Sequence, residues 1–61
     1  MERYRIEYKE AGSWKLDEVR KEWKEAILHA NILFKANSYR KLDNEVRIVD
    51  IIENKIKYLM K

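Results

Sequence analysis

The sequence predicts an α+β fold, a two-layer β-β-α-β-β domain with one amphipathic helix packed on one face of a small, mainly antiparallel sheet. Apolar residues recur at three- and four-residue steps over residues 18–37, as in a helix with one buried side. Residues 3–9 alternate between apolar and charged side chains, and residues 45–60 contain two further strand-like runs. We therefore expect residues 1–61 to form a single small domain.

The first strand is predicted over residues 3–9, RYRIEYK, where Tyr4, Ile6 and Tyr8 alternate with charged residues. Aromatic and β-branched side chains suit such a half-buried, pleated surface. The only glycine in the chain, Gly12, then interrupts the pattern. Glycine adopts positive φ without steric cost, so a turn is expected there.

Residues 14–17 fit two interpretations. Trp14 begins an apolar-polar alternation that could form a second strand, hairpinned to the first. Alternatively, Ser13 is the N-cap of a helix that starts at Trp14. We favour the strand, because a helix would place this tryptophan opposite its apolar side. Asp17 would then cap the helix, with Glu18 complementing the positive end of the helix dipole.

The helix is expected to continue to about Ala36, with Asn37 as a left-handed C-cap. Its apolar side contains Val19, Trp23, Ala26, Ile27, Ala30, Leu33 and Phe34. Leu28 and Ile32 do not fit this simple arrangement, because they lie one turn apart on the side that should face water.

The C-terminal part predicts a second hairpin. The β-branched run EVRIVDII, residues 45–52, indicates a strand, and KIKYLM, residues 55–60, indicates its partner. Residues 53 and 54 would form a tight turn between them. Asp50 interrupts the first run, so it is expected at a bulge or on the wet face of the sheet.

One face of the sheet should meet the helix. Its expected residues are Tyr4, Ile6, Tyr8, Val46, Ile48, Ile56, Tyr58 and Met60. Their expected partners on the helix are Trp23, Ile27, Ala30 and Phe34. Between helix and hairpin, residues 37–44 read as a loop in which Tyr39 and Leu42 fold back over the edge of the core.

Composition excludes several classes of protein. The chain has no cysteine, so disulfides and thiolate metal sites are excluded, and its single histidine cannot build a zinc site without several carboxylates beside it. No apolar run approaches the roughly 20 residues of a membrane span, and residues 1–10 do not form the apolar block of a secretory signal. Lack of cysteine is compatible with a cytoplasmic location.

No catalytic motif is found. His29 flanks the apolar side of the helix, with Glu25 one turn earlier, but ordinary helices carry such pairs for local support. A general base also needs a nucleophile and a cleft. A phosphate-binding loop needs more than one glycine. We therefore predict no enzyme, no catalytic residues, no cofactor or metal and no small-molecule substrate.

Two kinds of surface remain for a partner. The net charge is +3, and the residues predicted to form a basic patch on the outer sheet face are Arg3, Arg5, Lys9, Arg47, Lys55 and Lys57. This patch, interrupted only by Glu7, would suit nucleic acid, with Arg40 and Lys41 adding phosphate contacts. However, sheets that bind single-stranded nucleic acid stack its bases on exposed aromatic residues. Here the strand tyrosines occupy the same alternate positions as the core residues, so they are expected on the helix side of the sheet.

The second surface is apolar. Leu28 and Ile32 on the outer helix side, and Val49, Ile51 and Leu59 on the outer sheet face, have no place in the core. Contiguous exposed apolar area marks interfaces. We therefore expect a protein partner, either a host protein or a second copy of this chain in a homodimer, with nucleic acid as the alternative.

The run Glu25-Ala26-x-x-x-Ala30, a loop with tyrosine, and then residues 45–49, EVRIV, resemble a layout of short phage and mobile-element proteins. It is similar to that of small phage-encoded inhibitors of bacterial RNA polymerase, in which such a helix precedes a closing strand. The likeness covers residues 25–49. It implies a small, non-catalytic protein that binds and modulates a larger one, and it implies no functional residues.

Overall fold

The computed structural model describes residues 2–38 and 44–61 and confirms the α+β class. Its elements are β1 (Tyr4–Glu10), β2 (Ser13–Arg20), α1 (Trp23–Ser38), β3 (Val46–Asp50) and β4 (Lys55–Met60). The sheet has the order β2-β1-β3-β4 with antiparallel neighbours throughout. The interactions predicted for Tyr39, Arg40, Lys41 and Leu42 lie outside the described residues.

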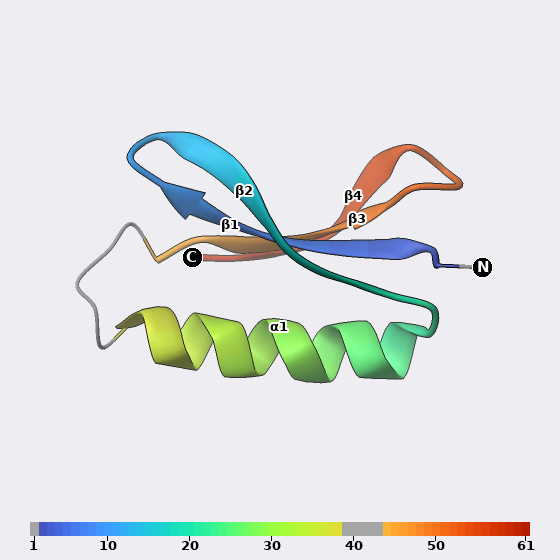
Figure 1. The fold of residues 1–61 in the computed structure, drawn as a ribbon, viewed down its shortest axis with the longest axis horizontal. Helices are drawn as coiled ribbons and strands as arrows, with labels where there is room; N and C mark the ends of the chain where they lie inside the picture. Colours follow the sequence, from blue (N-terminus) through green and yellow to red (C-terminus); the bar gives the residue numbers. More distant parts are fainter. Residues whose placement is uncertain (1, 39–43) are drawn as a thin grey trace.

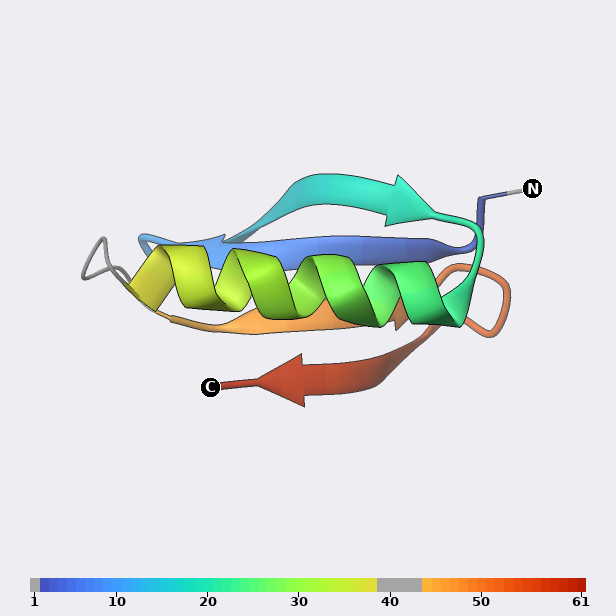
Figure 2. The ribbon, with the colours of Figure 1, turned by 90° about the horizontal axis from the view of Figure 1, so that it is seen from below.

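The helix α1 lies across one face of the sheet, over the two central strands β1 and β3 (Figures 1 and 2). The edge strands β2 and β4 extend beyond it on either side, and no described element covers the opposite face of the sheet. No helix among the described residues combines the length and the apolar character needed to cross a membrane.

The core lies between α1 and the central strands, as predicted. Its fully buried apolar residues are Ile6, Ala26, Ala30, Val46 and Ile48, against which Tyr4, Tyr8, Ile27, Leu33, Phe34 and Met60 pack. Two alanines at the centre of the helix side allow a close approach to the sheet. Trp23 closes one end of this contact through edge-to-face packing on Tyr4, at 5.3 Å, and on Tyr58, at 6.3 Å.

The structure confirms the strand interpretation of residues 14–17 and corrects the start of the helix. β2 continues to Arg20, and α1 begins only at Trp23, so Val19 belongs to the strand. Asp17 is therefore not a helix cap. At the other end, Asn37 lies inside α1 with its side chain buried, and it is not the predicted left-handed C-cap.

A bulge in β2 explains the wrong helix boundary. Ile6 pairs with Glu18 and Glu7 with Leu16, so Asp17 has no partner in β1. Because of this extra residue, Leu16 and Val19 lie on the same face of the sheet although they are three positions apart. A spacing of three is also typical of one side of a helix.

A second irregularity changes the C-terminal hairpin. The register shifts between Ile48 and Val49, so that Val49 pairs with Ile56 and Asp50 with Lys55. Ile56 therefore shares the outer face with Val49 and does not join the core, contrary to the prediction. Lys55 therefore lies on the helix side of the sheet, where it pairs with Asp50.

The strand β3 is also shorter than predicted. It ends at Asp50, and residues 51–54 form the turn, so Ile51 and Ile52 are not strand residues. Asp50 is fully buried on the helix side of the sheet, and not on its wet face. Its carboxylate accepts hydrogen bonds from the backbone N–H groups of Ile52 and Glu53 and so holds the turn.

Candidate functional site

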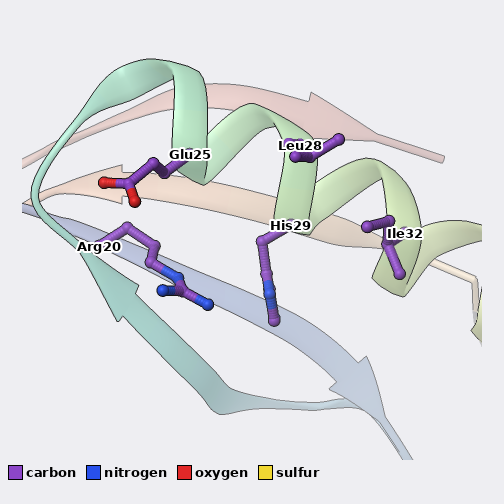
Figure 3. Close-up of a pocket in the computed structure, with 5 residues that line it drawn as sticks. All are labelled: Arg20, Glu25, Leu28, His29 and Ile32. Atoms are coloured by element: carbon purple, nitrogen blue, oxygen red, sulfur yellow. The ribbon is translucent and has the colours of Figure 1, made fainter.

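A groove of about 200 Å³ lies between β2 and α1 (Figure 3). It is lined by Arg20, Glu25, Leu28, His29 and Ile32. The structure confirms that Leu28 and Ile32 are exposed, at 63% and 60% of their surface. The groove exists because α1 packs over β1 and β3 and leaves the edge strand β2 only partly covered.

The carboxylates of Asp17 and Glu18 on β2 face His29 on α1. Its Nε2 lies 2.5 Å from Asp17 Oδ2, and its Nδ1 lies 3.6 Å from Glu18 Oε2. Their candidate ligand atoms all lie within 4.8 Å of one another. The sequence did not predict this cluster, because its patterns pair His29 with Glu25 on the same helix and place Asp17 at a helix cap.

The basic outer face is largely neutralised within the chain. Glu7 is buried between two arginines, with Arg47 Nε 2.6 Å from its Oε1 and an Arg5 nitrogen 3.1 Å from its Oε2. The Arg47 guanidinium also lies 4.1 Å above the ring centroid of Trp14 on the edge strand. Lys9 pairs with Glu45 at 3.3 Å.

The other predicted nucleic-acid residues also have carboxylate partners. Arg3 lies just before β1 and reaches Asp50 at 2.8 Å. Lys55 and Lys57 both contact Glu53, at 3.7 and 2.7 Å. A nucleic-acid phosphate would have to compete with these carboxylates for each cation.

The largest group of exposed apolar residues lies on the C-terminal hairpin. Nine large apolar side chains are exposed within the described residues, and five of them occur between residues 51 and 59. We call four of them the hairpin surface: Ile51, Ile52, Ile56 and Leu59. The fifth, Tyr58, pairs with Ile48 and packs on Trp23 at the helix side of the sheet. Val49, predicted to lie with Ile51 and Leu59, is half-buried opposite Ile56.

The predicted partner residues therefore separate into two surfaces. Leu28 and Ile32 border the groove on the β2 side of α1, whereas Ile51 and Leu59 belong to the hairpin surface. Sequence parity identified these residues as exposed but could not show which of them lie together. Comparison of the chain with protein-family models, curated proteins and solved structures found no match.

Proposed function

We propose that this chain is a small, non-enzymatic protein-binding module that docks on its partner through the hairpin surface. The observation that carries the proposal is the concentration of exposed apolar side chains on β4 and the turn before it. Exposing such side chains is unfavourable in water, and burying them against a partner is worth roughly 25 cal/mol per Å² of apolar area. Their number on one hairpin fits an interface better than scattered surface residues.

The charges around the hairpin surface support a protein partner. Lys55 and Lys57 flank the apolar residues on β4 and share a single carboxylate, that of Glu53, so they would form a rim with one excess positive charge. Such a rim would favour a partner with an acidic border and speed its encounter with the module. The candidate partners are a host protein, as the resemblance to phage proteins implies, and a second copy of this chain. We also propose a cytoplasmic location.

A capture experiment with matched variants tests this proposal. The purified chain is immobilised, and bound proteins are identified after exposure to extracts of its source and, for a phage protein, of its host. The test variant carries Ile52→Ser, Ile56→Ser and Leu59→Ser. Its control carries Leu28→Ser and Ile32→Ser, which remove exposed apolar side chains of similar size from α1.

We expect a partner that wild type and the control retain and that the hairpin variant loses. A partner retained by the hairpin variant, or no partner at all, would contradict docking through this surface unless the chain binds itself. Sedimentation velocity over a range of concentrations decides that last case, since self-association through the hairpin surface must disappear in the same variant.

A further inference from the structure

We propose that Asp17, Glu18 and His29 form a binding site for a divalent transition-metal ion such as Zn²⁺. This site lies between β2 and α1, outside the hairpin surface, and the inference does not depend on the proposed docking function. The composition alone required several carboxylates beside the single histidine. The fold supplies two of them, from a different element.

The bulge in β2 makes this arrangement possible. Neighbouring residues in a regular strand point to opposite faces, so Asp17 and Glu18 could not both reach one imidazole. Asp17 is the extra residue of the bulge, and its carboxylate meets the same histidine as that of Glu18. Bulges occur often next to functional sites, where they redirect a side chain.

The donor set has the chemistry that a borderline metal ion prefers. One imidazole nitrogen and two carboxylate oxygens give three protein ligands, the number that holds zinc in sites with an open coordination position. The candidate ligand atoms lie within 4.8 Å of one another. Asp17 is at Nε2 of the imidazole and Glu18 at Nδ1, so a rotation of the side chains must bring both carboxylates to the same ring nitrogen to surround one ion. The three side chains are 24–39% exposed, so an ion can enter from solvent.

The groove provides room for the remaining coordination. His29 forms part of its wall, so water molecules on an ion could occupy the adjoining 200 Å³. Glu25, one turn earlier on α1, also lines the groove, with its carboxylate on the side of Arg20 (Figure 3), and it is not among the donor atoms that lie within 4.8 Å of one another.

Binding would replace two existing contacts. The ion would separate His29 from Asp17 and would compete with Arg20, whose guanidinium lies 3.3 Å from Glu18 Oε2. In exchange, it would connect the edge strand β2 to α1 through metal–ligand bonds. Because the unfolded chain does not hold these three donors together, binding must stabilise the folded state.

Titration of the tag-free, chelator-treated protein tests the proposal. Zn²⁺ binding is followed by calorimetry, and Co²⁺ serves as a spectroscopic probe of the ligands. We expect saturable binding at one site and a rise in the midpoint of thermal unfolding. Amide and imidazole NMR signals should shift first around residues 17, 18 and 29.

Three variants locate the ion. Asp17→Asn and His29→Gln each remove a ligand with little change in side-chain size. Each should weaken the affinity for Zn²⁺ by at least about tenfold. Glu53→Gln removes a carboxylate from the separate ion-pair cluster with Lys57 and should leave affinity unchanged. Circular dichroism checks that every variant is folded. Absence of saturable binding, or equal affinity in all three variants, would overturn the proposal.

Discussion

Asp50 shows how one charged residue is accommodated inside this small fold. Its side chain has no exposed surface. Arg3 donates hydrogen bonds to both carboxylate oxygens, and the backbone N–H groups of Ile52 and Glu53 donate to Oδ1. The hydrogen bonds from Arg3, more than any other interaction, lower the pKa of Asp50 from 3.8 to about 2, against the opposing effect of desolvation.

Because of this lowered pKa, the free energy of unfolding depends on pH in the acid range. Because the pKa is lower in the folded state, the contribution of Asp50 is fully present above the unfolded value of 3.8 and is lost as the pH falls towards about 2. Asp50→Asn should lower the free energy of unfolding at neutral pH. It should also make that free energy depend less on pH in the acid range. Urea unfolding of both proteins at several pH values measures this. An equally steep pH dependence in the variant would assign it to other carboxylates, such as Glu53.

The β1–β2 turn offers a substitution that should stabilise the protein. Ala11 has φ of 51° and Gly12 of 81°, both in the left-handed region. A side chain without a local hydrogen bond is strained there, whereas asparagine is favoured at the first position of such a turn. Ala11→Asn should raise the free energy of unfolding by about 0.5–1 kcal/mol.

Asn54, with φ of 55°, provides the reciprocal control in the other hairpin. Asn54→Ala should lower the free energy of unfolding by a similar amount, about 0.5–1 kcal/mol, because it introduces the strain that Ala11→Asn removes. Urea denaturation of both variants gives the two values. Changes of the same sign would show that backbone conformation does not determine them.

At the level of elements, local patterns predicted the number and type of strands and the helix but not their exact boundaries. Tyr4, Ile6 and Tyr8 alternate without interruption, and β1 was placed correctly to within a residue. The errors arise where a strand contains an extra residue. In β2 the bulge at Asp17 gives Leu16 and Val19 a helix-like spacing, and in β4 the register shift moves Ile56 to the outer face.

Bulges depend on pairing with a neighbouring strand, so a single strand's sequence does not reveal them. The candidate metal site follows from the same cause. Asp17 and His29 are 12 residues apart in different elements, and they meet only because the bulge turns Asp17 towards α1. Their chemical types were visible in the sequence, but their proximity was not.

The helix α1 should tolerate charge on its outer side. Leu28 and Ile32 are exposed, so Leu28→Lys combined with Ile32→Glu should change the free energy of unfolding by no more than about 0.5 kcal/mol per substitution. Leu33→Ala is the control on the same helix, because Leu33 packs against the core. It should cost about 2 kcal/mol, which chemical denaturation will show.

At the level of the whole molecule, stability depends on one small contact between layers. Five apolar residues are fully buried, and they come from α1, β1 and β3. Typical stabilities of 0.05–0.15 kcal/mol per residue correspond to about 3–9 kcal/mol for a chain of this length. Neither edge strand contributes a fully buried apolar side chain. The edges can therefore change for binding while the central contact keeps the fold.

This division predicts a sharp contrast within β3. Ile48 is fully buried against α1, so Ile48→Ala should cost about 2–5 kcal/mol, a large part of the total. Its neighbour Val49 lies half-buried on the outer face, and Val49→Ala should cost less than about 1 kcal/mol. Thermal and urea unfolding monitored by circular dichroism compare the two variants. Equal losses would mean that the outer face of the sheet is covered in solution, as self-association would require.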